Sequence, residues 1–331
     1  MELTVAEIVA ATGGRLAAGS PEARCTTFHT DSRAVEPAGC FFALRGAALD
    51  GHAFCASAAA RGAVALVTER EVSSRGAAVV QVADTWRALY DLAEHVLGRV
   101  APLVVGITGS NGKTSTKELT AAVLGVRHRV LRTEGNLNSE TGLPLTLLRL
   151  EPAHTAAVLE MGMQGPGEIA RLAALARPRV GVVTMIGTVH LEFFSGVEAL
   201  ALAKAELVEA LPADGLAVLN AEDARFDLLR GRSRAPVVGF GLEAGDLRGE
   251  GYRALPDGGA EVTVEGTPVR LRLAGRHQAR NAVAALAAGR FGGVPVAEGA
   301  PALAGVEVAQ RLQELTAPAG FTVVDDAYNA S

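Results

Sequence analysis

Aromatic side chains, excess charge of one sign and long apolar runs are all scarce in this sequence. Aromatic residues make up only 4% of its 331 residues, so alanine and glycine must do much of the core packing. The net charge is only -5 and there is no basic stripe, which argues against a nucleic-acid-binding surface. No apolar run is long enough to span a bilayer, so we expect no membrane span.

Cysteine is also scarce, and the pattern of the cysteines bears on the compartment. Cys25, Cys40 and Cys55 are odd in number and form no CxxC motif, which favours a reducing compartment. The first residues contain no basic segment, so we expect no signal peptide and predict a cytoplasmic protein. Hydrophobic residues make up 49% of the chain, enough to build a core, and its length predicts two or three domains.

One glycine-rich stretch organises the chain. Its residues are Thr108, Gly109, Ser110, Asn111, Gly112, Lys113 and Thr114. It follows the apolar run 102–107, which predicts a buried strand, and it precedes residues 115–124, whose apolar spacing predicts a helix. Strand, glycine-rich turn, Lys-Thr and helix are the context of a phosphate-binding loop, in which backbone N–H groups and the helix N-terminus face an anion.

Two side chains of this loop have predicted roles. Lys113 would reach the β- and γ-phosphates of a nucleotide, and the Thr114 hydroxyl would hold Mg²⁺. The general pattern has glycine six residues before the lysine, where this chain has Ile107. The stretch is therefore a variant phosphate loop, and by itself it predicts nucleotide binding.

Alternating strand and helix patterns predict an α/β fold. Residues 1–99 are predicted to form a small N-terminal α/β domain. Residues 100–315 are predicted to form a central domain with a doubly wound, mostly parallel sheet and an antiparallel insertion between about 237 and 274. Residues 316–331 contain a predicted strand with carboxylates at its tip, which we interpret as the start of a third, Rossmann-like domain that is truncated.

Polar residues of the central domain follow two of its predicted strands. Glu160 and His190 lie at the C-terminal ends of predicted strands, the edge at which open α/β sheets bind ligands. Together they could hold a Mg²⁺ ion that bridges phosphates and substrate. Each also has an ordinary explanation, as a capping carboxylate or a hydrogen-bonded structural histidine. Lys204, on a predicted helix, is by default a solvated lysine.

These motifs resemble those of the Mur ligases, ATP-dependent amide-forming enzymes of peptidoglycan precursor synthesis. The sequence Thr-Gly-Ser-Asn-Gly-Lys-Thr is that family's form of the phosphate loop, which accounts for Ile107. Residues 31–54, 135–144 and 325–330 extend the resemblance over essentially the whole chain. It is strongest to the members that join D-alanyl-D-alanine to UDP-N-acetylmuramoyl-tripeptide (UDP-MurNAc-tripeptide).

The resemblance implies roles for individual residues. Near the UDP-linked substrate it places Ser32, Arg33, Arg45, Gly46, Asp50, His52, Asn136 and Asn138. Near ATP it places the phosphate loop together with His277, Asn281, Arg311, Asp326 and Tyr328. The implied metal ligands are Thr114, Glu160, His190 and Lys204, and the implied catalytic residues are Lys113, Lys204, His190 and Glu160. Lys204 matches a lysine that family members carry as a carbamate formed with CO₂, which would make it a metal ligand.

The implied reaction is ATP-dependent amide bond formation through an acyl phosphate, with two Mg²⁺ sites and a monomeric enzyme. Without most of the third domain, we expect this chain to have little ligase activity. Four alternatives stay open: a Mur-type ligase that adds a single amino acid, a ligase similar to folylpolyglutamate synthase, a simple phosphate-loop NTPase or kinase, and a non-catalytic binding module.

Overall fold

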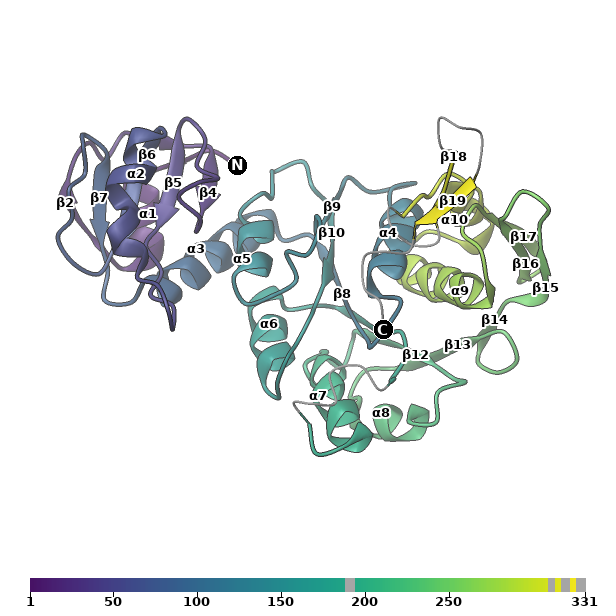
Figure 1. Ribbon diagram of the computed structural model, residues 1–331. Coiled ribbons are helices and arrows are strands. Elements are labelled where there is room, and N and C mark those ends of the chain that lie inside the picture. The colour runs from purple at the N-terminus through teal and green to yellow at the C-terminus, as the bar shows by residue number, and fades with distance from the viewer. Residues whose placement is uncertain (188–193, 309–312, 317–321, 326–331) are drawn as a thin grey trace. The chain divides into compact units, whose positions relative to one another are not determined.

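The computed structural model describes residues 1–187, 194–308, 313–316 and 322–325, and the chain divides into two compact units (Figure 1). The first unit comprises Met1–Ala101 and Glu140–Ala153, and the second comprises Pro102–Ser139 and His154–Ser331. Within the described residues, no helix has both the length and the apolar character needed to cross a membrane.

The first unit is built on a five-stranded sheet of order β2-β7-β6-β5-β4, in which only β2 runs antiparallel to its neighbour. Its strands are β2 (Arg15–Ala18), β7 (Ala78–Gln81), β6 (Ala63–Thr68), β5 (Gly39–Phe42) and β4 (Thr27–His29). A short antiparallel pair joins β1 (Leu3–Thr4) and β3 (Arg24–Cys25). The helical elements are α1 (Val5–Thr12), η1 (Gly51–Phe54), α2 (Cys55–Ala60), α3 (Thr85–Val100) and α5 (Gly142–Leu147).

Local sequence explains where two of these helices begin and end. Thr4 and Glu7 form a capping box at the start of α1, and the helix ends at Gly13 in the left-handed conformation at φ +63°. The Asp84 carboxylate accepts hydrogen bonds from the first-turn N–H groups of Trp86 and Arg87 in α3.

The second unit is built on a seven-stranded, fully parallel sheet of order β14-β13-β12-β11-β8-β10-β9. Its strands are β8 (Leu103–Thr108), β9 (Val130–Arg132), β10 (Ala156–Glu160), β11 (Val180–Val183), β12 (Leu216–Asn220), β13 (Val237–Gly241) and β14 (Leu247–Arg248). The order reverses at β8, which lies between β10 and β11. The C-terminal end of β8 is therefore the switch point at which such sheets bind ligands.

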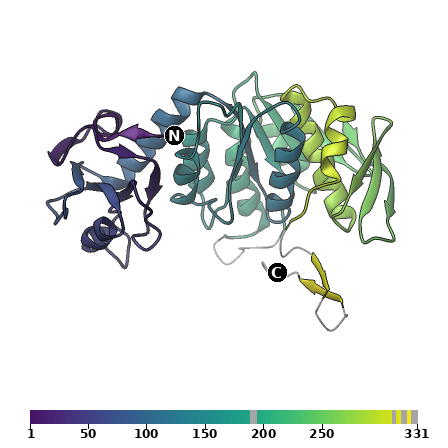
Figure 2. The ribbon, with the colours of Figure 1, turned by 90° about the horizontal axis from the view of Figure 1, so that it is seen from above.

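Helices cover both faces of this sheet, as the doubly wound prediction requires (Figure 2). One layer contains α4 (Lys113–Leu124), α9 (Arg276–Phe291) and α10 (Val296–Leu303). The other contains α6 (Glu168–Ala176), α7 (Val197–Glu209) and α8 (Phe226–Arg232). A Cβ atom on Gly289 of α9 would lie 2.3 Å from Val123 Cγ1 of α4, so small residues are what allow these two helices to pack closely.

The antiparallel insertion is confirmed, but its predicted start at residue 237 was wrong. β13 and β14 extend the parallel sheet, with Ala217 of β12 in register with Val237. The antiparallel sheet contains only β15 (Glu250–Ala254), β16 (Ala260–Val264) and β17 (Thr267–Leu271). Strand β13 contains two glycines, is only partly buried over its first two residues and lies near the sheet edge, so it lacks the uninterrupted apolar run of a central parallel strand. An antiparallel pair, β18 (Gln313–Thr316) and β19 (Thr322–Asp325), includes the strand predicted within residues 316–331.

Candidate functional site

The phosphate loop connects β8 to α4 and requires glycine at two positions. Gly109 and Gly112 have φ angles of +150° and +85°. A Cβ atom on Gly109 would lie 1.9 Å from Thr184 Oγ1, and one on Gly112 would lie 2.9 Å from Asn281 Oδ1. Both positions therefore exclude a side chain through backbone conformation and through close neighbours.

The segment that follows β11 holds the loop from one side. The Thr184 hydroxyl donates a hydrogen bond to the Asn111 carbonyl at 2.5 Å. The Ser110 N–H donates to the Met185 carbonyl at 2.8 Å, and the Gly187 N–H donates to Ser110 Oγ at 2.9 Å. These bonds fix the loop independently of any ligand.

Glu160, at the end of β10, lies beside the first turn of α4. The Thr114 hydroxyl donates to its Oε2 at 3.0 Å, and the Asn138 amide donates to its Oε1 at 2.8 Å. The Glu160 N–H donates to Thr133 Oγ1 at 3.0 Å, and the residue is only 3% exposed. A buried carboxylate beside a phosphate-loop hydroxyl supplies the oxygen ligands that Mg²⁺ prefers.

Two lysines face the same region. The Lys113 ammonium donates to the Gly109 carbonyl at 2.8 Å and to the Ser110 carbonyl at 3.2 Å, so it lies over the loop. Lys204 projects from α7 and is 2% exposed. Burial, and then the positive charge of Lys113, lower the pKa of Lys204 to about 7. Lys204 is therefore not the solvated lysine that its helical position alone suggests.

The N-terminal part of α9 lies next to the start of α4. The Asn281 amide donates to Gln278 Oε1 at 3.1 Å, and the Gln278 amide donates to Ser115 Oγ at 3.2 Å. Asn281 and Gln278 are buried, whereas His277 is exposed. The structure thus places Asn281 directly against Gly112 of the phosphate loop.

The residues predicted to bind the UDP-linked substrate in the first unit are largely paired with each other or with neighbours. Arg33 donates hydrogen bonds to Asp31 that lower the pKa of Asp31 to about 2. His52 is buried, with Nδ1 2.6 Å from Asp50 Oδ1, and its Nε2 accepts the Glu69 N–H at 2.8 Å. Because Nε2 accepts, Nδ1 carries the proton in this arrangement. Both ring nitrogens of His52 are therefore engaged within the unit.

The structure describes some of the remaining predicted site residues and leaves four of them outside its described ranges. Ser32 is buried, Arg45 and Gly46 lie in the loop after β5, and Asn136 is exposed in the loop after β9. His190, Arg311, Asp326 and Tyr328 lie outside the described residues. Among the residues that are described, no three His, Cys, Asp or Glu side chains come together to hold a metal ion.

Three polar residues near the loop were not predicted: Thr184, Asn220 and Asp223. Each follows or ends a buried parallel strand, as Glu160 does. That position was the signal that could have identified them, because the C-terminal ends of parallel strands share one edge of the sheet.

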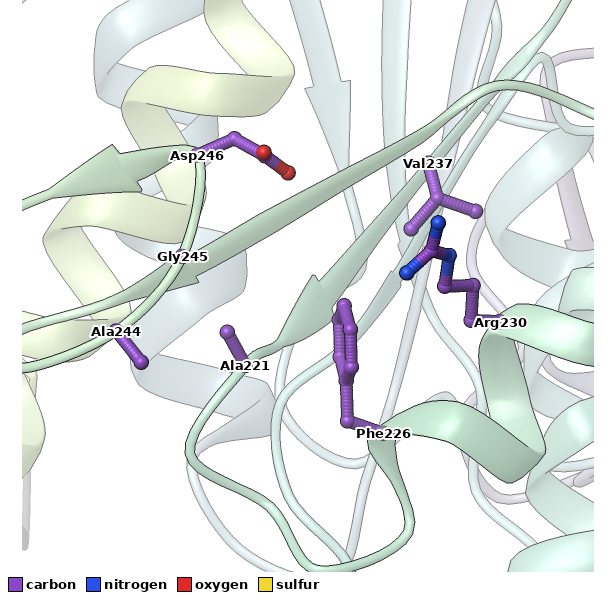
Figure 3. Close-up of a pocket in the computed structure, with 7 residues that line it drawn as sticks. All are labelled: Ala221, Phe226, Arg230, Val237, Ala244, Gly245 and Asp246. Atoms are coloured by element: carbon purple, nitrogen blue, oxygen red, sulfur yellow. The ribbon is translucent and has the colours of Figure 1, made fainter.

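A separate pocket of about 430 Å³ lies beside β13 (Figure 3). Its lining residues are Ala221, Phe226, Arg230, Val237, Ala244, Gly245 and Asp246. The Asp246 carboxylate accepts the Gly239 N–H at 2.8 Å, which fixes the turn between β13 and β14. None of the lining residues belongs to the phosphate loop, so this pocket is distinct from the loop site.

Comparison with known proteins gives consistent matches. Residues 107–289 match the model of the Mur ligase middle domain, and residues 26–101 match that of the Mur ligase family catalytic domain. A UDP-N-acetylmuramoyl-tripeptide–D-alanyl-D-alanine ligase of Bacillus subtilis is 35% identical over 336 residues, which cover 99% of this chain and 72% of the relative.

Solved structures agree with these sequence matches. A crystal structure of MurF from Acinetobacter baumannii has a TM-score of 0.92 at 31% identity, covering 100% of this chain and 74% of that one. MurF from Thermotoga maritima in complex with ADP has a TM-score of 0.79 at 33% identity, covering 92% of this chain and 71% of that one.

Proposed function

The chain belongs to the Mur ligase family, and from this premise we infer that it serves the ATP-dependent joining of D-alanyl-D-alanine to UDP-MurNAc-tripeptide in peptidoglycan precursor synthesis. The observation that carries this inference is the variant phosphate loop, with Thr114 bonded to Glu160 at the switch point of the sheet. It occurs in a chain that is 35% identical over nearly its whole length to a ligase of that specificity.

The loop suits the phosphates of ATP. Its backbone N–H groups and the N-terminus of α4 provide partial positive charge, and Lys113 adds a full charge above them. Lys113 now donates to two carbonyls of the loop, and it would exchange them for phosphate oxygens. Asn281 packs against Gly112 of the loop, and the family resemblance implies that it lies near the ATP.

Thr114 and Glu160 would hold Mg²⁺, because a hydroxyl and a buried carboxylate lie together there. Bound Mg²⁺ would neutralise charge on the transferred phosphoryl group. His190 stays a predicted ligand. Two Mg²⁺ sites, the monomeric state and the cytoplasmic location also stay predictions.

A carbamate formed on Lys204 is also a predicted metal ligand. Only a neutral amine adds to CO₂, and a pKa of about 7 keeps a large part of the Lys204 amine neutral near neutral pH. Addition forms an N–C bond, releases one proton and leaves a carboxylate-like group. In ¹³C-bicarbonate the protein should show a carbamate carbon resonance by NMR that Lys204→Met removes. An unchanged spectrum in Lys204→Met would refute this role.

The reaction follows in two steps. A terminal carboxylate oxygen of the tripeptide attacks the γ-phosphorus, which gives an acyl phosphate and ADP. The amine of D-alanyl-D-alanine then attacks the acyl carbon, phosphate leaves, and the nitrogen loses one proton. Lys113 stabilises the negative charge on the phosphoryl oxygens during the transfer.

An amine panel tests this function. The protein that carries this chain is incubated with ATP, UDP-MurNAc-tripeptide and either D-alanyl-D-alanine, single amino acids or no amine, and ADP is measured. We expect ADP formation that depends on both the tripeptide and the dipeptide. Turnover with a single amino acid instead would support a different Mur-type ligase, and turnover without any amine would support a simple NTPase.

A further inference from the structure

The phosphate loop is held by a short segment that is itself held by the next strand. We call residues 184–187, which follow β11, the strap. The strap forms hydrogen bonds with Ser110 and Asn111 of the loop. On its other side, the Asn220 amide donates to the Thr184 carbonyl at 3.1 Å, and the Ile186 N–H donates to Asp223 Oδ2 at 2.6 Å.

The Asp223 carboxylate is anchored by its own turn. Its Oδ1 accepts the Arg225 N–H at 2.9 Å, and its backbone carbonyl accepts the Phe226 N–H at 3.0 Å at the start of α8. A carboxylate that accepts a backbone N–H makes a stronger bond than a neutral acceptor. Asp223 therefore ties the strap at Ile186 to a fixed point beyond β12.

Asn220 is anchored in the same way. It is 5% exposed, and its Oδ1 accepts the Glu222 N–H at 3.0 Å while its amide holds Thr184. Thr184 in turn leaves no room for a side chain at Gly109, as the 1.9 Å approach of its Oγ1 shows. The contacts run without a break from the end of β12, through the strap, to the loop that faces the phosphates.

We propose that Asp223 and Asn220 are positioning residues for nucleotide binding, which act by holding the strap against the phosphate loop. The proposal rests on the proposed function, because it assumes that residues 108–114 bind nucleotide phosphates. A loop that is already held pays less ordering entropy when the ligand binds, so loosening the strap weakens binding without removing any ligand contact.

Asp223→Asn is the most informative variant. The Ile186 and Arg225 N–H groups bond different oxygens of Asp223, and an asparagine has an NH₂ group in place of one of them, so in the same side-chain position it keeps only one of the two bonds. When the asparagine oxygen keeps its bond to the Arg225 N–H, the asparagine NH₂ group faces the Ile186 N–H. The bond to Ile186 is then lost and the strap is released. Hydrogen exchange measured by mass spectrometry should then rise in peptides that cover the strap and residues 108–114.

Binding is measured by isothermal titration calorimetry, with ADP and Mg²⁺ titrated into the protein that carries this chain and into its variants. We expect the Kd to rise roughly tenfold for Asp223→Asn and for Asn220→Ala, as for the loss of one hydrogen bond to a charged or buried group. Asp227→Ala is the charge control, because Asp227 is exposed in the first turn of α8. Val262→Ala is the stability control, because Val262 is buried in the antiparallel sheet.

The outcomes separate the two claims. If the wild-type protein that carries this chain binds no ADP, the proposed function fails. If the wild type binds ADP and Asp223→Asn binds it equally well, only the positioning role fails. If Val262→Ala weakens ADP binding as much as Asp223→Asn, the effect is not specific to the strap and the positioning role is again refuted.

Discussion

The sheet edge of the second unit and the loops of the first unit use the same kinds of polar residue in different ways. At the sheet edge, bonds join residues from different strands and helices, as between Thr114 and Glu160 or between Thr184 and Asn111. In the loops of the first unit, Asp31 bonds with Arg33 and Asp50 bonds with His52, each only two residues away, and His52 in addition accepts the Glu69 N–H. Bonds between distant elements build a rigid ligand site, whereas bonds between sequence neighbours shape a loop.

This difference bears on function. The N–H groups of the phosphate loop and the Lys113 ammonium are positioned before any ligand arrives, so single substitutions there should affect binding directly. In the first unit, His52 is buried and both of its ring nitrogens are hydrogen-bonded, so its substitution should affect folding rather than contact with a ligand. Substitutions in the two units should therefore have separable effects on binding and on folding.

The largest expected effect is at Lys113. In Lys113→Met, the loss of charge-assisted bonds to the phosphates should weaken ATP binding by roughly 100-fold. Titration calorimetry measures the Kd, with Arg253→Ala as a control because Arg253 is an exposed residue of the antiparallel sheet. A Kd within twofold of the wild type would show that the phosphates bind elsewhere.

The next effect is at Glu160. In Glu160→Gln, Mg²⁺ should lose an anionic ligand, so the strengthening of ATP binding by Mg²⁺ should fall by roughly tenfold. Binding of ATP in EDTA should change little, and this comparison in one variant is its own control. Equal Mg²⁺ dependence in the variant and the wild type would contradict the assignment of Glu160.

In the first unit, His52→Ala leaves the Glu69 N–H without its acceptor and removes the side-chain bond to Asp50, whose carboxylate keeps the N–H of residue 52 and the Arg70 guanidinium. The free energy of unfolding of the first unit should fall by about 1–3 kcal/mol, while the Kd for ADP should stay at the wild-type value. Urea denaturation and ADP titration measure the two quantities. Unchanged stability together with impaired binding of the UDP-linked substrate would instead make His52 a contact residue.

The smallest effect concerns pH. Burial lowers the pKa of His29, which lies in β4, below its ordinary value of 6.5. The folded chain therefore binds fewer protons at this site than the unfolded chain, and stability is lost as pH falls through 6.5 and below. His29→Gln should unfold with a shallower pH dependence between about pH 7 and 5. A steeper dependence in the variant would reverse the assigned sign.

Sequence patterns identified the sheet edge because its signals are local. The glycines of residues 108–114 and the apolar runs before Thr108 and Glu160 each predict one strand end, and parallel strands bring such ends together. The depressed pKa of Lys204 was beyond this reasoning, because it depends on which charges fold around the residue. The strap was missed because Thr184 and Asp223 look like ordinary turn residues until the strand order is known.

The segment Glu140–Ala153 shows the same limit on a larger scale. It follows β9 in the chain, yet it packs in the first unit, where α5 contacts α3. Its six-residue helix, Gly142–Leu147, has too few turns for a clear apolar period. Its partner is fixed only by tertiary packing.

Transfer of an oxygen isotope tests the central claim, activation of a carboxylate by ATP, most directly. The protein that carries this chain is supplied with ATP, D-alanyl-D-alanine and UDP-MurNAc-tripeptide whose terminal carboxylate is labelled with ¹⁸O. An acyl phosphate intermediate predicts that each phosphate released carries one ¹⁸O atom, with the other retained in the new amide. Unlabelled phosphate, or label found in AMP, would contradict the account.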